Sequence, residues 1–194
     1  MTLNEVLKNT NYELSLFSEE GRDFVEGAIF VKTVRGKKMP FITCQKRNKE
    51  IVLKPEEAVR QLYLYKLIHE YGYPTSRIEV EFPIHFGREV KRADIAIMDK
   101  DRLMVPYIIV ELKKPKLTDG KEQLKSYCNA TGAPIGVWTN GEQISYYNRK
   151  DPNYFEPITN IPKVSEKLSD IINEKFTYED LKKIDRISQQ KRSL

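Results

Sequence analysis

The 194-residue sequence predicts an α/β fold in which helices flank a central mixed β-sheet, with an N-terminal β layer and C-terminal helices. Three observations predict it. Residues 107–110 are a continuous run of aromatic and β-branched side chains, which is typical of a buried strand. Helical periodicity precedes this run at 55–72 and follows it at 117–130. The middle of the chain therefore alternates between strands and helices, as layered α/β domains do.

The composition is 40% hydrophobic and 31% charged, which is typical of a globular chain. No apolar run approaches the ~20 residues that a membrane helix needs. Residues 1–5 show no secretory signal, so we expect a cytoplasmic protein without a membrane partner. Two cysteines exclude a four-cysteine zinc or iron–sulfur site, and two histidines disfavour a histidine-rich metal site. The net charge of +5 permits a polyanionic partner.

The first segment, about residues 1–50, is interpreted as a β layer. Strands at 28–32 and 39–44 flank the turn 35–38, and a second turn at 46–49 leads into a third strand. Both turns are basic. We interpret them as solvated loop tips, with contact to phosphate as the alternative.

The first clear helix is predicted to begin at Pro55, a residue suited to the first helical position, and to end near Gly72. Glu56 and Glu57 match the positive end of the helix dipole, and that role is enough to explain one of them. Glu57 shares a helix face with Arg60 by i, i+3 spacing. The face is polar in its first turn and apolar afterwards, which places Glu57 at the edge of the helix–sheet contact.

Two strands are expected next, at 78–86 and 92–98. The first alternates strictly between apolar and polar residues, as a half-buried antiparallel strand does. In the second, Asp94 faces away from the apolar positions. It is either a functional acid or the partner of Arg92 in a salt bridge.

The buried strand at 107–112 ends in an acid and a base two residues apart. Since the side-chain period of a strand is two, Glu111 and Lys113 point to the same face, and Pro115 ends the strand. Charges are seldom placed in a sheet interior unless they are paired or bound to a metal. The alternative is an ordinary surface pair at a strand end.

The remaining elements complete the sheet. The helix at 117–130 carries Gln123 and Tyr127 on one face, because they are four residues apart. A strand at 133–139 and the turn Asn140-Gly141 predict a hairpin. Two polar helices are expected at 164–173 and 178–190.

This organisation suggests three parts. Residues 1–54 form the N-terminal β-rich layer, residues 55–150 the α/β core, and residues 151–194 a C-terminal helical segment or linker.

Asp94 and Glu111 are expected to be neighbours if their strands pair through the short turn between them. Carboxylates gathered on one face repel each other unless a cation lies between them. Oxygen ligands with few histidines or thiols select Mg²⁺ or Mn²⁺. Lys113 could lower the pKa of a metal-bound water or stabilise charge on a phosphate, so this set of residues indicates phosphodiester hydrolysis.

These residues resemble a nuclease signature. Ala93-Asp94, followed 17 residues after Asp94 by Glu111-Leu112-Lys113, resembles the PD-(D/E)xK motif, with Ala93 where the motif usually has proline. Gln123 and Tyr127 resemble the QxxxY motif of RecB-type nucleases, and Glu57 resembles their N-terminal helix acid. The surrounding sequence, from about residue 29 onwards, resembles the N-terminal domain of type I restriction enzyme R (motor) subunits.

The resemblance implies a restriction-endonuclease-like core that cuts DNA with Mg²⁺ or Mn²⁺. Asp94 and Glu111 would bind metal, with the Leu112 carbonyl as a possible third ligand. Lys113 would position or activate the attacking water, and Glu57 would hold metal-bound water or a second ion. Gln123 and Tyr127 would orient Lys113 or contact a phosphate, with simple helix packing as the alternative. The basic neighbours of these residues that we predict to contact DNA are Arg60, Arg92 and Lys114.

The resemblance also implies partners. In a prokaryotic cytoplasm the R subunit acts on double-stranded DNA with methyltransferase and specificity subunits, and cuts non-specifically after ATP-driven translocation. This sequence contains no Gly-x-x-x-x-Gly-Lys-Ser/Thr stretch, so ATP would bind only in the full-length subunit. The alternatives are a stand-alone nuclease of the same fold, such as a repair exonuclease or junction resolvase, and a non-catalytic DNA-binding or docking module.

Overall fold

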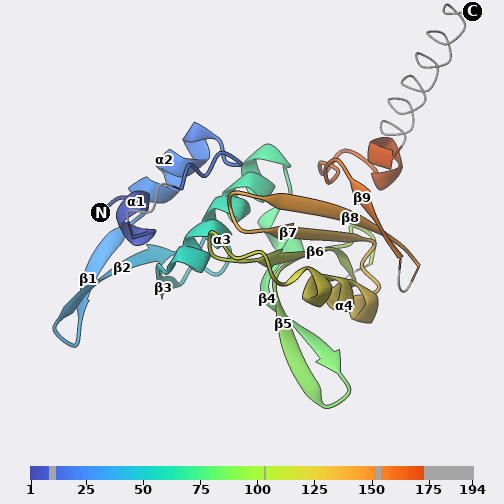
Figure 1. The fold of residues 1–194 in the computed structure, drawn as a ribbon, viewed down its shortest axis with the longest axis horizontal. Coiled ribbons are helices and arrows are strands. Elements are labelled where there is room, and N and C mark those ends of the chain that lie inside the picture. Colours follow the sequence, from blue (N-terminus) through green and yellow to red (C-terminus); the bar gives the residue numbers. More distant parts are fainter. Residues whose placement is uncertain (9–11, 103, 152–153, 173–194) are drawn as a thin grey trace, which may run out of the picture.

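A computed structural model of the chain describes residues 1–8, 12–102, 104–151 and 154–172 (Figure 1). Its centre is a six-stranded sheet in the order β4-β5-β6-β7-β8-β9. The strands are β4 (Ile78–Phe86), β5 (Glu89–Met98), β6 (Pro106–Leu112), β7 (Ile135–Thr139), β8 (Ile144–Asp151) and β9 (Tyr154–Ile158). Only the β6–β7 pair is parallel, so the sheet is mixed, as predicted.

Helices cover both faces of this sheet. The helix α4 (Lys121–Thr131) connects the parallel strands β6 and β7, because a parallel pair needs a crossover connection. It packs Leu124, Tyr127 and Cys128 against one face. On the other face lies α3 (Pro55–Tyr65), which continues as a π-helical segment, Lys66–Glu70. The predicted α/β architecture is confirmed.

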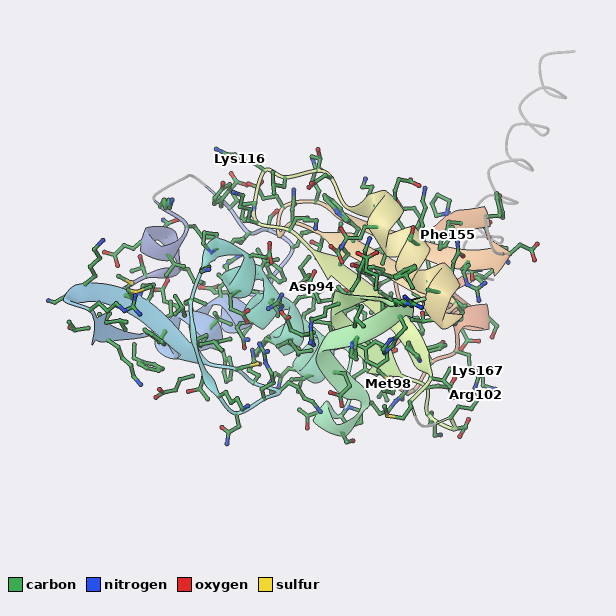
Figure 2. All side chains as sticks on the ribbon, turned by 90° about the horizontal axis from the view of Figure 1, so that it is seen from below. Asp94, Met98, Arg102, Lys116, Phe155 and Lys167 are labelled. Atoms are coloured by element: carbon green, nitrogen blue, oxygen red, sulfur yellow. The ribbon has the colours of Figure 1, made fainter. Side chains whose placement is uncertain are left out.

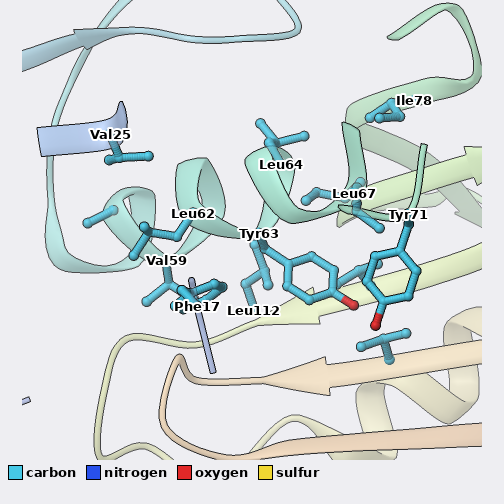
Figure 3. Close-up of a cluster of buried hydrophobic side chains, with 14 of the residues drawn as sticks. Phe17, Val25, Val59, Leu62, Tyr63, Leu64, Leu67, Tyr71, Ile78 and Leu112 are labelled. Atoms are coloured by element: carbon cyan, nitrogen blue, oxygen red, sulfur yellow. The ribbon is translucent and has the colours of Figure 1, made fainter. Parts of the chain in front are cut away.

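Each face of the sheet packs against its own apolar core, and the core under α3 is the larger one. Val59, Leu62 and Tyr63 of α3 share an apolar cluster with Val110 and Leu112 of β6 (Figure 3). All five side chains are at most 1% exposed. Each buried side chain of this size contributes roughly 1.5–3 kcal/mol, so this packing fixes α3 on the sheet and, with it, the polar first turn of the helix.

The N-terminal β layer is a separate three-stranded sheet in the order β1-β2-β3. Its strands are β1 (Phe30–Val34), β2 (Lys37–Thr43) and β3 (Glu50–Val52), which confirms the predicted hairpin and third strand. Two helices that the sequence reading missed precede it, α1 (Leu3–Val6) and α2 (Glu19–Gly27). Their signals were the N-caps Thr2 and Ser18, whose hydroxyls accept hydrogen bonds from the Glu5 and Gly21 backbone N–H groups.

Some boundaries differ from the predictions. A 3₁₀ turn, Thr75–Arg77, precedes β4, and α4 begins at Lys121 rather than at 117 because Gly120 turns the chain there with φ +93°. In the first predicted C-terminal helix, residues 164–166 lie in a turn region and residues 168–172 are helical. Residues 173–194, which include the second predicted C-terminal helix, lie outside the described residues. Within the described residues, no helix combines the length and apolarity needed to cross a membrane.

The registers of the sheet place three acids in one row. The pairs Ile95–Val110 and Ala96–Ile109 between β5 and β6 bring Asp94 opposite Glu111 at the next position. In β4, Val80 pairs with Ile95 and Phe82 with Ala93, and Glu81 lies between them with a left-handed φ of +58°. Arg60 contacts both Glu81 and Asp94, and the Leu112 N–H beside Glu111 donates to Asp94, so these carboxylates lie close together.

Candidate functional site

An acidic cluster lies where the first turn of α3 meets the row of acids on the sheet. We define it by five carboxylates and two cations. The acids are Glu56 and Glu57 of α3, Glu81 of β4, Asp94 of β5 and Glu111 of β6, and the cations are Arg60 and Lys113. The formal charge of the cluster is negative even with both cations present.

Arg60 lies at the centre of the cluster and is only 6% exposed. Its guanidinium contacts Glu57 and Asp94 at 2.5 Å each and Glu81 at 3.1 Å. Burial disfavours the charged guanidinium, but Glu57 and Asp94 outweigh it and raise the pKa of Arg60. From the sequence we predicted that Arg60 contacts DNA; the structure places it instead among carboxylates, where it holds the acids of α3 to the acid of β5.

Asp94 joins two elements through its two oxygens. Oδ1 accepts a hydrogen bond from Arg60 at 2.5 Å, and Oδ2 accepts one from the Leu112 backbone N–H at 2.7 Å. The second bond fixes the Asp94 carboxylate at the end of β6, next to Glu111. Asp94 therefore does not pair with Arg92, which donates to the Glu81 carbonyl at the surface.

Glu111 is the most unusual side chain of the cluster. It is 2% exposed, and its Oε1 accepts a hydrogen bond from Lys113 Nζ at 2.7 Å. Its other oxygen, Oε2, is buried and has no hydrogen-bond partner among the residues that the structure describes. Burial and then the charge of Asp94 raise the pKa of Glu111 to about 7, although Lys113 acts in the opposite direction. An unsatisfied buried carboxylate oxygen is rare and marks a place where a further group can bind.

Lys113 is partly buried and stays on the same side as Glu111, as the strand period predicts. Burial opposes its charge, but the ion pair with Glu111 outweighs that effect and raises the pKa of Lys113. The backbone at Gly120 passes so close that a Cβ there would lie 2.5 Å from Lys113 Cε. Glycine is therefore required at this position for the observed placement of Lys113.

The two residues of the predicted second motif pair with each other. Gln123 Nε2 donates to the Tyr127 hydroxyl at 2.7 Å, and neither forms a hydrogen bond to Lys113 within the described residues. Both line a cavity of about 550 Å³ together with Phe86, Lys91 and Ser126. Burial raises the pKa of Tyr127, and Glu111 also contributes, so the hydroxyl is within electrostatic reach of the cluster.

The other two predicted DNA contacts, Arg92 and Lys114, are exposed. The structure thus brings Glu57, Asp94, Glu111 and Lys113 together, places Gln123 and Tyr127 in an adjacent cavity, and leaves Arg92 and Lys114 at the surface. Reasoning from sequence missed Glu81, which looked like a solvated position of an alternating strand, and the central position of Arg60.

The donor atoms of the cluster suit a hard cation. Asp94 and Glu111 are carboxylates, and Glu111 Oε2 is free to coordinate. Within the described residues, no three His, Cys, Asp or Glu side chains are grouped so as to hold a metal ion. Glu57, the predicted third acid, is held by Arg60 and by Gln61, whose Nε2 donates to it at 2.8 Å. Mg²⁺ commonly uses one or two carboxylates and keeps several waters, so two acids fit it.

The pKa of Glu111 predicts how the stability of the metal-free protein depends on pH. Because the pKa is raised from 4.5 to about 7 on folding, the folded state binds the extra proton and stability is greatest below the unfolded pKa. Between pH 5 and 7 the unaltered protein should lose roughly 1 kcal/mol per pH unit relative to Glu111→Gln.

Urea denaturation in EDTA at several pH values measures this difference. Glu122→Gln is the control, because Glu122 is exposed and its ion pair is with Lys125, outside the acidic cluster. Parallel pH profiles for the unaltered protein and Glu111→Gln would show that Glu111 is ionised throughout.

The close approach of Gly120 to Lys113 gives a second prediction. Gly120→Ala should destabilise the protein by about 1–2 kcal/mol through its positive φ and should also displace Lys113 from Glu111. Gly132→Ala is the matched control, because Gly132 also has a positive φ of +75° but a Cβ there would meet nothing within 4 Å.

Only Gly120→Ala should alter the pH profile attributed to Glu111. Urea denaturation of both variants tests this expectation, and identical pH profiles would refute the proposed contact.

Comparison with known proteins gives one family. The family described as type I restriction enzyme R protein N terminus (HSDR_N) matches residues 55–162, which include α3, all six strands of the central sheet and α4. No curated protein matches the chain. Among solved structures it is similar to a candidate nuclease of DUF820 from Anabaena variabilis, at 17% identity and a TM-score of 0.39, covering 84% of this chain and 89% of that one. The family match confirms the resemblance read from the sequence: this chain belongs to the type I restriction enzyme R protein N-terminus family.

Proposed function

We propose that this chain is a metal-dependent endonuclease domain that hydrolyses phosphodiester bonds of DNA with Mg²⁺ or Mn²⁺. One observation carries the proposal: the buried Oε2 of Glu111, which no described residue hydrogen-bonds, lies in a cluster with Asp94 and Lys113. A carboxylate pair with an open oxygen can bind a hard cation, and an adjacent ammonium can stabilise a phosphate. Membership of the R protein family supports the same reaction.

Each residue of the cluster then has a chemical role. A bound Mg²⁺ would supply Lewis-acid activation of a water and of the phosphate. Asp94 and Glu111 would hold it, and the Leu112 N–H keeps Asp94 in place for this purpose. Lys113, whose pKa is raised by its ion pair with Glu111 in the metal-free chain, would act as an ammonium that orients water and stabilises developing negative charge. Arg60 limits the repulsion between Asp94 and Glu57.

The proposal includes the biological setting implied by the family. The domain would act in the cytoplasm of a prokaryote as part of an R subunit, together with methyltransferase and specificity subunits. It would cut without sequence preference after the ATP-driven motor has translocated the DNA. Gln123 and Tyr127 would contact a phosphate near Lys113, because the cavity that they line also contains the cationic side chain of Lys91.

A non-catalytic DNA-binding module is the second candidate, and one observation favours it. In this structure both oxygens of Asp94 are occupied, Oδ1 by Arg60 and Oδ2 by the Leu112 N–H. If Arg60 permanently replaces the metal, the domain binds DNA without cutting it.

Substitution of Lys113 tests the nuclease proposal. Lys113→Ala should reduce plasmid cleavage in Mg²⁺ or Mn²⁺ by ~10²-fold or more, because it removes the group that stabilises phosphate charge. Lys116→Ala is the control, since Lys116 is exposed and contacts the Tyr12 ring rather than the cluster. Thermal melting shows whether both variants are folded.

The outcomes separate the candidates. Metal-dependent cutting that Lys113→Ala abolishes, with cut sites scattered over the plasmid, supports the nuclease proposal and the R-subunit setting. Repeated cutting at defined sites would indicate a self-contained restriction nuclease. Cleavage that Lys113→Ala leaves unchanged would contradict the assignment of this cluster, and DNA binding without any cleavage would favour the non-catalytic module.

A further inference from the structure

Positive charge in this chain is concentrated in the segment that forms the three-stranded sheet β1-β2-β3. Residues 29–54 contain eight lysines and arginines and a single acid, Glu50, which gives a net charge of +7. The whole chain carries +5, so the remaining residues together carry −2. We interpreted the two basic turns as separate solvated tips, but folding joins them in one three-stranded sheet.

Most of these basic side chains are exposed and unneutralised. The exposed ones are Lys32, Arg35, Lys37, Lys38, Lys49 and Lys54, and Lys46 and Arg47 are half-buried. Lys32 forms an ion pair with Glu50, and Lys46 forms one with Glu79 at 3.4 Å. The other six form no ion pair with any residue that the structure describes. The sheet therefore presents uncompensated positive charge to its surroundings.

The outer part of the sheet is a two-stranded ribbon, β1–β2, which projects from the body of the molecule (Figure 1). Residues 31–34 of β1 are all exposed, including Val31 at 44% and Val34 at 39%. From the register, Lys32 and Lys37 emerge on one face and Lys38 on the other. Beyond the half-buried Phe30, β1 buries neither face and adds little to the core, so packing alone does not explain the ribbon.

At the tip of the ribbon, the charged residue Arg35 has a left-handed backbone conformation that is unfavourable for most side chains. Val34 pairs with Lys37, so the loop consists of Arg35 and Gly36, which have φ values of +49° and +75°. This is the type I′ arrangement, which favours asparagine, aspartate or glycine at the first position. An arginine there is less stable than asparagine, and a strained position of this kind suggests a functional reason for the side chain.

We propose that the β1–β2 ribbon binds the phosphate backbone of duplex DNA, an inference that rests on the proposed nuclease function. A two-stranded ribbon fits the major groove of B-DNA, and basic side chains on both faces reach phosphates on both sides of the groove. Such contacts carry no sequence information, which agrees with a nuclease that cuts without sequence preference.

Because the acidic cluster is negatively charged, DNA needs a separate basic surface on which to bind. The acidic cluster contains five carboxylates and two cations, so without bound metal it repels DNA. The basic sheet is directly connected to the cluster, since β3 leads through Lys54 into the turn of α3 that carries Glu57. The sheet that would bind DNA is therefore followed directly in sequence by the helix that carries Glu57 of the acidic cluster.

A ribbon variant tests the proposal with the full chain. Arg35→Asn, Lys37→Gln and Lys38→Gln together remove three charges and create an Asn-Gly turn, which favours the same hairpin. Fluorescence anisotropy with a labelled duplex, in Ca²⁺ at several salt concentrations, should show binding weakened by at least ~10-fold at 0.1 M salt. The slope of log K against log salt should fall by about 2.7, because each phosphate contact contributes about 0.9.

The control variant removes the same charge elsewhere. Lys100→Gln, Lys163→Gln and Lys167→Gln change exposed lysines around one surface pocket, and Lys167 lies at the opposite end of the molecule from the ribbon (Figure 2). This variant should bind DNA nearly as the unaltered chain does. Thermal melting of both variants confirms that the fold is intact.

Three results would overturn the ribbon assignment: equal losses in the two variants, unchanged binding of the ribbon variant, or no DNA binding by the unaltered chain. Unchanged binding together with aggregation would mean that the lysines protect the exposed edge of β1. The nuclease proposal is judged separately, because it depends on the loss of cleavage in Lys113→Ala, whereas the ribbon assignment depends on the binding of the ribbon variant.

Discussion

The repulsion between Asp94 and Glu111 is the constraint on which the rest of this site depends. The register of β5 and β6 places the two acids opposite each other, with Glu111 buried and Asp94 half-buried. At short range in a medium of low dielectric constant, two negative charges cannot both remain uncompensated. In the structure, Arg60 forms an ion pair with Asp94 and Lys113 forms one with Glu111. The pKa of Glu111 is also raised, which favours its neutral form.

Arg60 links this constraint to the fold. The packing of α3 over the sheet fixes its first turn, so that Arg60 reaches acids on three elements while it remains buried. Removal of one partner of such a network leaves a buried charge without compensation, which is costly. The same network also holds Asp94 Oδ1, so Arg60 would compete with the proposed metal ion for this carboxylate.

Sequence reasoning identified the elements whose signals are local. The caps and periodicity of α3, the apolar run of β6 and the i, i+4 pair on α4 are properties of short segments, and the structure confirms those elements. The position of Arg60 and the inclusion of Glu81 depend on how α3 lies over the sheet and on the β4–β5 register, which no short segment specifies. The charge of residues 29–54 was visible in the sequence, but only the fold shows that it gathers on one projecting sheet.

The central claim is that Asp94 and Glu111 share one divalent cation, and proton release on Mn²⁺ binding tests it most directly. Titration calorimetry at pH 6 in two buffers with different ionisation enthalpies counts the protons released per ion bound. Because the pKa of Glu111 is about 7, binding should release roughly one proton at pH 6 and almost none at pH 8.5. Glu111→Gln should bind more weakly and release none. Mn²⁺ binding of unchanged affinity and proton release in Glu111→Gln, or no detectable binding to the unaltered chain, would contradict the account.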